Sequence, residues 1–353
     1  MIAWVQTAFG GPEVRGLSEA PAPRAAASEV IVRVAAAALN RLDVLQRAEV
    51  VVPGFTLPHV AGMDVAGEVV EAGSAEGADL VGRSVVVDPV VSCGHCVWCD
   101  ADTPTYCADF ATIGSTRWGG FAEFVLVPAR NCTVIDVALD DTDGFVEAAS
   151  IPVAGVTAWR GLVSAGRIQP GETVVIPGAG SGLGVAGIQI AKLHGAHVIA
   201  LAGSADKVAP ATDLGADDVI VRTDGDWVEQ ARELTDGLGA DLVWDHVGGR
   251  FLTQALQATR TGGRVVLSGT TDGLRSDLYL PDLYQPGRSI IGHGSYGRKD
   301  MADVTAAYAD GRIRPVIDSV WGFEELPKAE AKLECGDFFG KIVLRGPGRG
   351  AAA

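Results

Sequence analysis

The sequence predicts an α/β protein that combines a doubly wound parallel sheet with a separate, mainly β domain. Two observations predict this class. Residues 172–207 read as strand, glycine-rich turn, helix and second strand, whereas the first hundred residues read as short β-rich runs. A chain of 353 residues is longer than one typical domain, so two domains and a large buried core are expected.

The parallel sheet begins in the stretch ETVVIPGAGSGLGVAGIQIAKLHGAHVIALAGSADK, residues 172–207. The β-branched run Thr173–Ile176 stops at a Pro-Gly pair, a helix follows the glycine turn, and a second strand begins at His197. Parallel neighbours need such a crossover, which is right-handed. Glycine lets a pyrophosphate approach the backbone, and the first helical N–H groups, at Gly184 and Val185, lack helical partners. The unit therefore predicts a dinucleotide site.

The glycine spacing matches the dinucleotide fingerprint only in part. A strict G-x-G-x-x-G pattern requires three glycines at fixed positions, and here those positions read Ala179, Ser181 and Gly184. The alternative is therefore a purely structural glycine turn in some other α/β protein.

Composition and charge exclude several classes of protein. Hydrophobic residues are 48% and charged residues 20%, which is typical of a globular enzyme rather than a disordered or fibrous chain. The net charge of -16 disfavours general affinity for nucleic acid or for an anionic membrane. No apolar run reaches the roughly 18 residues of a membrane span, and the start MIAWVQTAFGGPE lacks the features of a signal peptide. We expect a cytoplasmic protein.

Short strands precede the glycine turn and predict a compact β unit. Between Gly, Pro and Ala breaks, β-forming residues cluster at Ile2–Gln6, Glu29–Val34, Gly67–Val70 and Ser84–Val87. At the other end of the chain, the Gly/Arg/Ala-rich tail Gly346–Ala353 is expected to fray.

Four closely spaced cysteines indicate a structural metal site. The pattern is Cys93-x2-Cys96-x2-Cys99-x7-Cys107. Four thiolates surround one tetrahedral Zn2+ and leave no open position for a substrate. Disulfides are disfavoured in a reducing cytosol, and an iron–sulfur cluster or redox thiols are the remaining alternatives. We therefore predict one structural zinc ion per chain.

Motifs along nearly the whole chain resemble the medium-chain dehydrogenase/reductase superfamily. In chain order they are LPHVAGMDVAGEVVEAG, the cysteine lobe, GGFAEFVLVPARN, EAASIPVAGVTAWRGL, the glycine turn, LGADDVI, DHVGG and FFGKIVL. The lobe is similar to zinc-type alcohol dehydrogenases, and the remainder to quinone oxidoreductases and enoyl reductases. The resemblance implies a GroES-like catalytic domain over residues 1–153 with a zinc lobe at about 93–107, a Rossmann coenzyme domain over 154–295, and a return to the first domain over 296–353.

The resemblance also implies the loss of the family's catalytic zinc. Zinc-dependent relatives hold that open ion with a Cys, the His of a G-H-E motif and a further Cys or acid. Here those positions read Asn40, Met63 and Val153. None of these side chains is an ordinary zinc ligand, so the chain is expected to lack this site.

One alternative keeps a catalytic metal in altered form. Asp43, His59 and Asp64 are metal-capable side chains in the same region, although hydrogen bonding of His59 and Asp64 within their loop is the simpler interpretation. Without a Lewis acid, alcohol oxidation loses its usual support. Hydride addition to an activated C=C bond depends less on a Lewis acid, because hydrogen-bond donors can hold the carbonyl or quinone oxygen.

The end of the second Rossmann strand favours NADP(H). Relatives that use NAD carry an acid there to bind the ribose hydroxyls, and this chain has Ala202 instead. Ser204 can donate a hydrogen bond to a 2'-phosphate, and Lys207 can supply positive charge. Arg222 can add a second cation or stack on the adenine. The alternative for both basic residues is an ordinary solvated surface charge.

The resemblance assigns further residues to the coenzyme and substrate. It implies that Asn40 and Asp43 lie beneath the nicotinamide and Thr157 at the domain junction, and these three are the candidate catalytic residues. Thr157 also counts as a coenzyme-binding candidate, together with Gly180, Ser181, Gly182, Leu183, Gly184, Val247, Gly269, Thr270, Thr271 and Lys341. No Tyr occurs between Asn40 and His59, where some enoyl-thioester reductases of the family place a proton donor, so a dedicated fatty-acyl reductase is disfavoured.

These observations predict an NADPH-dependent oxidoreductase that reduces the C=C bond of α,β-unsaturated carbonyls or quinones without a catalytic metal. We expect a small-molecule substrate and a homodimer, with neither nucleic acid nor membrane as a partner. Two alternatives stay open. One is a zinc-dependent alcohol dehydrogenase with altered ligands, and the other is a homologue that binds the coenzyme without catalysing a reaction.

Overall fold

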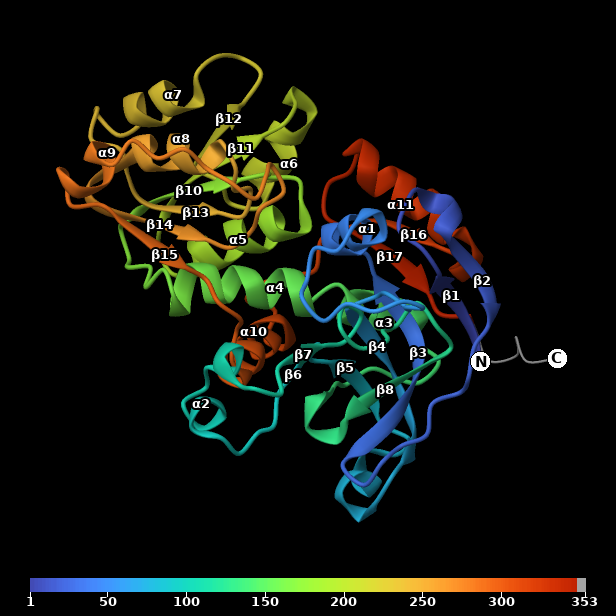
Figure 1. Ribbon diagram of the computed structural model, residues 1–353. Helices are drawn as coiled ribbons and strands as arrows, with labels where there is room; N and C mark the ends of the chain where they lie inside the picture. Colours follow the sequence, from blue (N-terminus) through green and yellow to red (C-terminus); the bar gives the residue numbers. More distant parts are fainter. Residues whose placement is uncertain (348–353) are drawn as a thin grey trace. The chain divides into compact units, whose positions relative to one another are not determined.

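The chain folds into two units, shown in a computed structural model that describes residues 1–347 (Figure 1). The first unit contains Met1–Val153 and the chain from Ile317 onward, and the second contains Ala154–Val316. The strands of the first unit are β1 (Ile2–Gln6), β2 (Arg15–Glu19), β3 (Glu29–Ala38), β4 (Asp64–Ala72), β5 (Ser84–Val87), β6 (Val90–Val91), β7 (Ala111–Thr112), β8 (Phe124–Pro128), β9 (Cys132–Val134), β16 (Ile317–Trp321) and β17 (Lys341–Arg345). Its helices are α1 (Arg41–Ala48), α2 (Val97–Asp100), α3 (Thr142–Ala149) and α11 (Leu326–Cys335).

The first unit is built around a sheet with the order β16-β17-β3-β4-β5-β9, to which β8 adds by pairing with β3. The predicted strands of the first hundred residues correspond to β1 and β5 and to parts of β3 and β4. Their valines, such as Val32, Val65 and Val85, are fully buried in one core cluster. Lys341 begins β17, which pairs antiparallel with the end of β3. This pairing brings the end of the chain to the segment that precedes α1.

Buried charges join the N-terminal strands to the C-terminal helix of this unit. Glu330 on α11 accepts hydrogen bonds from Arg15 on β2 and, at 2.5 Å, from Arg47 on α1. The side chains of all three residues are at most 3% exposed. A buried carboxylate between two guanidinium groups is tolerated because each charge is paired. The triad fixes α1, which carries Asp43.

The second unit is a doubly wound parallel sheet. Its elements are α4 (Pro152–Trp159, which starts in the first unit), β10 (Thr173–Pro177), α5 (Gly182–Leu193), β11 (His197–Ala202), α6 (Val208–Asp213), β12 (Asp218–Val221), α7 (Trp227–Glu233), β13 (Ala240–Asp245), α8 (Phe251–Ala258), β14 (Thr259–Leu267), α9 (Pro281–Tyr284), β15 (Ser289–Gly292) and α10 (Arg298–Ala309). The strand order is β12-β11-β10-β13-β14-β15, and every pair is parallel. The order reverses at β10, so the crevice above the carboxyl ends of β10 and β13 is where such sheets bind ligands.

Helices cover both faces of this sheet because its strands are apolar on both sides. Val175 of β10 shares a core cluster with Trp227 of α7 and Phe251 of α8. Its neighbour Ile176 points to the opposite face and lies near Gly187 of α5. In Figure 1, α7 and α8 accordingly lie on one side of the sheet and α5 on the other. The predicted β-α-β unit is therefore confirmed.

The second unit extends further along the chain than the sequence predicts. We assigned residues 296–353 to the returning segment, but residues 296–316 pack with the second unit. The reason is that α10 is apolar toward α4: a Cβ at Gly155 would lie 3.2 Å from Val304 and from Tyr308. Asp300 of α10 also pairs with Arg160, at 3.5 Å. The chain returns to the first unit only at β16.

Two further expectations concern membrane-spanning helices and the C-terminal tail. Within residues 1–347, no helix combines the length and apolar character needed to cross a bilayer. Of the tail that was expected to fray, residues 348–353 lie outside the described part of the chain, whereas Gly346 N donates to Ala35 O at 2.7 Å.

Candidate coenzyme and substrate site

The turn between β10 and α5 is built for close approach of the backbone. Gly178 has a φ of +61°, a left-handed conformation that favours glycine. A Cβ at Gly184 would lie 2.1 Å from the carbonyl oxygen of Gly178, so no larger residue fits there. Ser181 caps α5 by accepting a hydrogen bond from Gly184 N at 2.9 Å. We expected the partnerless helical N–H groups at Gly184 and Val185, but Gly184 N donates to the Ser181 cap and Val185 N donates to Ser181 O at 2.9 Å. The helix begins two residues earlier, at Gly182, so the N–H groups of Gly182 and Leu183 precede any intrahelical acceptor and can bind a pyrophosphate. Predicted residue Gly180 lies in this turn.

A second loop meets this turn at the carboxyl ends of β13 and β14. Asp245 accepts a hydrogen bond from Val247 N at 2.8 Å, and Thr271 Oγ1 donates to Val247 O at 3.4 Å. A Cβ at Gly269 would lie 2.3 Å from the carbonyl oxygen of His246. The segment Gly269–Thr271, which includes Thr270, therefore lies directly against Val247. The sequence-predicted residues of both loops are brought together at one edge of the sheet.

His246 connects the two loops by a hydrogen bond, a role that the sequence analysis did not predict. Its Nε2 lies 2.8 Å from the carbonyl oxygen of Pro177, the residue before the glycine turn. Because a carbonyl oxygen can only accept, Nε2 carries the proton. Burial lowers the pKa of His246 to about 4. The imidazole is therefore a neutral donor that holds the end of β13 to the end of β10.

The residues predicted to bind a 2'-phosphate lie after β11 and β12. Ala202 is fully buried at the end of β11, and Arg222 N donates to Ala202 O at 3.0 Å, which brings the exposed Arg222 beside it. Ser204 and Lys207 are partly buried in the following turn. Asp206 lies in the same turn, and a hydrogen bond from the Ser204 side chain, together with the charge of Lys207, lowers its pKa. The turn thus contains one carboxylate that the sequence analysis did not predict to matter.

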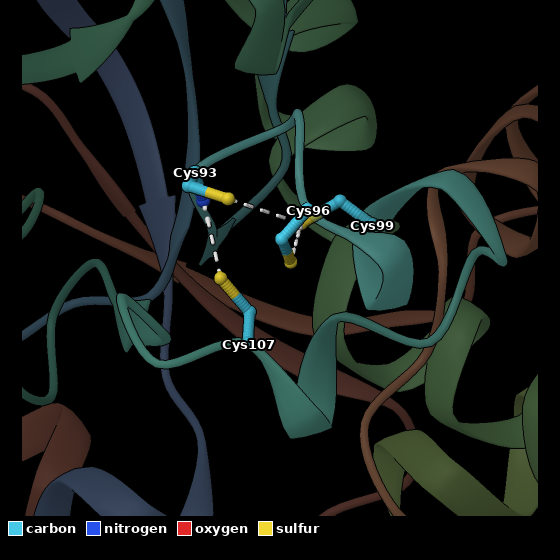
Figure 2. Close-up of side chains that lie close together, drawn as sticks. All are labelled: Cys93, Cys96, Cys99 and Cys107. Carbon is cyan, nitrogen blue, oxygen red and sulfur yellow. Dashed lines mark hydrogen bonds between the residues drawn. The ribbon is translucent and has the colours of Figure 1, made fainter.

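The four cysteines converge as predicted (Figure 2). Their Sγ atoms all lie within 4.8 Å of one another. The Sγ atoms of Cys93 and Cys99 are 3.8 Å apart, and those of Cys96 and Cys99 are 3.6 Å apart. In a tetrahedron with Zn–S bonds of about 2.3 Å, sulfur atoms are separated by about 3.8 Å. Backbone N–H groups also face the sulfurs, with Cys93 N donating to Cys107 Sγ at 3.4 Å. The donor set therefore fits a closed structural zinc site.

A lysine binds residues beside the positions that the resemblance assigns to the open metal. Lys341 Nζ is 2.7 Å from Asp64 Oδ2, 2.9 Å from Asn40 Oδ1 and 2.9 Å from Leu39 O. Asn40 Nδ2 also donates to Asp64 Oδ2 at 2.9 Å. The three donors of the ammonium thus have three acceptors. Contact of Lys341 with the coenzyme remains a prediction, and it would require exchange of one of these bonds.

The residues of the possible remodelled metal site bind separate partners. His59 Nε2 donates to Gly114 O at 3.2 Å, and burial lowers its pKa to about 4. Asp43 accepts hydrogen bonds from Asn40 N at 2.7 Å and Gly62 N at 3.3 Å, and complete burial raises its pKa to about 7. Asp64 pairs with Lys341. In the described part of the chain, the cysteines are the one group of metal-capable side chains close enough to share an ion.

The third candidate catalytic residue, Thr157, lies on α4. Its backbone oxygen faces His293 Nε2 at 3.1 Å, which makes the imidazole nitrogen a donor. His293 is largely buried, and this burial lowers its pKa. The contact joins α4 to the segment after β15. A role for the Thr157 hydroxyl remains a prediction.

Comparison with known proteins decides the family. Residues 26–137 match the alcohol dehydrogenase GroES-like domain, and residues 182–310 match the zinc-binding dehydrogenase family. An NAD-dependent alcohol dehydrogenase of Sulfolobus acidocaldarius is 33% identical over 345 residues, which cover 96% of this chain and 97% of the relative. The chain belongs to the medium-chain dehydrogenase/reductase superfamily.

Members of this superfamily with different activities are about equally similar to the chain. An acryloyl-coenzyme A reductase of Sulfurisphaera tokodaii is 30% identical over 93% of this chain and 96% of its own length. A solved structure of an NAD-dependent alcohol dehydrogenase is 37% identical with a TM-score of 0.89, and the match covers 98% of this chain and 99% of that one. The fold and the oxidoreductase class are therefore established, and the choice of substrate is left to the residues of the site.

Proposed function

We propose that this medium-chain enzyme reduces the C=C bond of α,β-unsaturated carbonyl compounds with NADPH and without a catalytic metal. The observation that carries the proposal is that the positions at which zinc-dependent relatives are expected to hold the open ion read Asn40, Met63 and Val153, and that Asn40 Oδ1 already accepts a hydrogen bond from Lys341 at 2.9 Å. None of these three side chains is an ordinary zinc ligand. The similarity to acryloyl-coenzyme A reductases supports the same reading. A quinone is a second substrate class with the same requirement.

The proposed reaction needs hydrogen-bond donors at the carbonyl oxygen of the substrate. When bound, NADPH supplies a hydride to the β-carbon and leaves as NADP+. The electron pair of the C=C bond then moves toward the carbonyl, so negative charge develops on its oxygen. Asn40 is the side-chain amide of the cluster that can donate a hydrogen bond to this oxygen. Water supplies the proton that the α-carbon finally takes up.

The coenzyme is proposed to be NADP(H), held by both loops of the second unit. The glycine turn Gly180–Gly184 would hold the pyrophosphate, and Val247 with Gly269–Thr271 would face the nicotinamide half. Ser204, Lys207 and Arg222 would hold the 2'-phosphate beside the small, neutral Ala202. A charge-assisted hydrogen bond to phosphate contributes about 1.5–3 kcal/mol, or one to two decades in affinity. The carboxylate of Asp206 opposes this contribution.

The substrate experiment compares reduction and oxidation with both coenzymes. We expect turnover of enones, enoyl thioesters or quinones with NADPH, and slow or absent oxidation of simple alcohols. Rapid alcohol oxidation that depends on added zinc would refute the proposal. Tight NADPH binding with no turnover of the whole panel would instead identify a coenzyme-binding protein without catalytic activity.

The coenzyme experiment uses two substitutions and one control. Ala202→Asp adds repulsion to a 2'-phosphate and a partner for ribose hydroxyls, and Lys207→Ala removes a cation. Both should lower the ratio of kcat/KM for NADPH to that for NADH by about 10- to 100-fold at fixed ionic strength. Lys299→Ala changes an exposed lysine of α10 and should leave the ratio unchanged. A wild type that prefers NADH would show that the pocket is misassigned.

A second candidate function is NAD-dependent alcohol oxidation. It is favoured by Asp206, whose carboxylate can accept from ribose hydroxyls, and by the similarity to NAD-dependent alcohol dehydrogenases. Under this reading the wild type prefers NADH, and Asp206→Ala removes the preference. The coenzyme variants therefore separate NAD from NADP, and the substrate experiment separates alcohol oxidation from reduction of the C=C bond.

We also propose that the enzyme is a homodimer. Strand β15 pairs with β14 on one side and ends the six-stranded sheet, which leaves an edge on which a second copy can add strands. Exposed apolar side chains follow β14 in the chain, namely Leu274, Tyr279, Leu280 and Tyr284, each at least 62% exposed. Light scattering should give twice the chain mass, and a monomer at micromolar concentration would contradict the proposal.

A further inference from the structure

We propose that Arg130 is a positioning residue of the cysteine lobe. Its guanidinium orients the Cys93–Gly94 peptide so that the Gly94 N–H faces Cys99 Sγ, and its charge strengthens the hold of the four thiolates on zinc. The inference rests on the closed zinc site that the cysteines fit, and it goes beyond the proposed reaction, in which the lobe takes no part. Arg130 belongs to the motif GGFAEFVLVPARN, to which neither the coenzyme nor the substrate assigns a role.

Asn131, the neighbour of Arg130, holds the strand that enters the lobe. It is 5% exposed, and its Nδ2 donates to Asp88 O at 2.8 Å and to Val90 O at 2.7 Å. Asp88 N donates in return to Asn131 O at 2.8 Å. Both hydrogens of the amide are therefore used, and the short 3-10 turn Ala129–Asn131 is held beside β6. These bonds fix the backbone from which Arg130 reaches the lobe.

The guanidinium of Arg130 binds two successive carbonyl groups at the first cysteine. Its Nη1 donates to Cys93 O at 2.8 Å, and its Nη2 donates to Ser92 O. His95 Nδ1 lies 3.0 Å from the same Cys93 oxygen, which has two lone pairs. The guanidinium also lies directly against Gly94, where a Cβ would be 1.8 Å from Nη1. A rigid fork of donors can bridge two neighbouring oxygen atoms, which the point charge of a lysine does less well.

Holding the carbonyl group of Cys93 also aims the N–H of the same peptide. The C=O of Cys93 and the N–H of Gly94 belong to one planar trans unit and point in opposite directions. Gly94 N donates to Cys99 Sγ at 3.3 Å, so this peptide lies between the guanidinium and a metal-binding sulfur. A cation at the oxygen polarises the peptide and strengthens its N–H bond to the sulfur. Arg130 therefore acts on the thiolate through the peptide group.

The charge of Arg130 compensates an acidic lobe. Four thiolates carry more negative charge than one Zn2+ neutralises. The lobe itself, residues 93–107, adds Asp100 and Asp102 and contains neither lysine nor arginine. A positive charge must therefore come from outside the lobe, and Arg130 supplies one. Because the guanidinium is exposed, salt and water screen its charge, and its effect on zinc is moderate.

The central test measures how tightly the full-length enzyme holds zinc. Arg130→Met removes the charge and the donors, and competition with a chromophoric chelator should give a zinc Kd about 10-fold above that of wild type, the lower end of the range for outer-shell partners of metal ligands. Arg130→Lys keeps the charge without the fork and should lie between the two. The matched control is Arg33→Met, which breaks an ion pair of β3 with Glu68 at 3.0 Å and should leave the zinc Kd unchanged.

A spectroscopic readout follows the bond to sulfur and depends on neither affinity nor turnover. In enzyme loaded with one Co2+ per chain, charge-transfer bands from thiolate to cobalt report the electron density on the sulfur atoms. A weaker N–H bond to Cys99 leaves more density on its sulfur. The bands should therefore move to longer wavelength in Arg130→Met and stay in place in Arg33→Met. If Arg130→Met does not fold, as judged by circular dichroism, Arg130→Gln removes the charge and takes its place in both experiments.

Either an unchanged zinc Kd or unchanged cobalt bands in the neutral variant would overturn the inference. A loss of affinity as large in Arg33→Met as in Arg130→Met would also overturn it, because that result assigns the effect to general loss of stability. A wild type that binds neither metal at the lobe would refute the zinc site and the inference together. Failure to reduce any enone would refute the proposed function and leave both metal readouts intact.

Discussion

The cysteine lobe and the Lys341 cluster are two groups of atoms suited to a cation, and they are built differently. In the lobe, four thiol groups within 4.8 Å of one another keep the donor set of a closed metal site. In the cluster, the oxygen atoms of Asp64 and Asn40 instead face the ammonium of Lys341 at 2.7 and 2.9 Å. One region has the donor set of a closed metal site, and in the other the oxygen atoms are bound by a side chain.

The difference shows what each cation is required to do. A structural ion needs only a closed shell of donors, and four thiolates provide it. A catalytic ion needs an open position, which a lysine with three acceptors does not offer. The Lys341 cluster contains a positive charge, but that charge has no position left for a substrate. We therefore expect the two regions to respond in opposite ways to metal removal and to charge removal.

The largest effect should follow loss of the metal from the lobe. Cys96→Ser removes one of four thiolates and should lower zinc from about one ion per chain to nearly none, because structural zinc sites bind with apparent free energies of about 10–16 kcal/mol that depend on the full ligand set. The melting temperature should fall, while kcat of the folded fraction stays close to wild type. Calorimetry and metal analysis measure the first two quantities. A variant that retains zinc and stability but loses turnover would show that the lobe has a catalytic role.

The next largest effect should follow loss of charge from the cluster. Lys341→Met alone leaves Asp64 buried without its cation, and breaking a buried pair from one side typically costs about 3–5 kcal/mol. Denaturant unfolding should show a loss of this size, most of which returns when Asp64→Asn is added. Zinc content should not change in either variant. Equal stability of Lys341→Met and wild type would show that the ion pair does not hold the cluster together.

A smaller, pH-dependent effect should come from Asp43, which anchors the backbone of Asn40. Its folded pKa of about 7 lies above the unfolded value, so between about pH 4 and pH 7 the folded chain retains a proton that the unfolded chain releases. The free energy of unfolding should therefore fall as pH rises through this range. Asp43→Asn, which mimics the protonated form, should flatten this slope. A slope that is unchanged in Asp43→Asn would show that Asp43 does not cause it.

The parts of the site that depend on local spacing could be predicted from the sequence. Three of the four cysteines lie three residues apart, and the glycine turn, with Ser181 at its helix cap, lies within one β-α-β unit. The parallel pairing of the two strands in this unit, through a helical crossover, could also be predicted. In the cysteine lobe and in the glycine turn, the interacting atoms lie close together because their residues are close in the sequence.

The parts that depend on long-range packing could not be predicted in this way. Lys341 and Asp64 are 277 positions apart, and nothing local distinguishes this lysine from one that binds a coenzyme. His246 belongs to the DHVGG motif, but the motif does not indicate its hydrogen bond to Pro177 O. The role of Asp206 depends on how its carboxylate lies relative to Ser204 and Lys207, which residue spacing alone does not determine. These residue pairs come together only in the folded structure.

The most direct test of the central claim is the zinc content of an enzyme preparation whose NADPH-dependent enone reduction has been measured. The account predicts about one zinc ion per chain, held by the cysteine lobe, and a rate that does not rise when more zinc is added. A content of about two ions per chain, with a rate that follows occupancy of the second, would show that a catalytic metal is present. That result would contradict the proposed reduction without a catalytic metal.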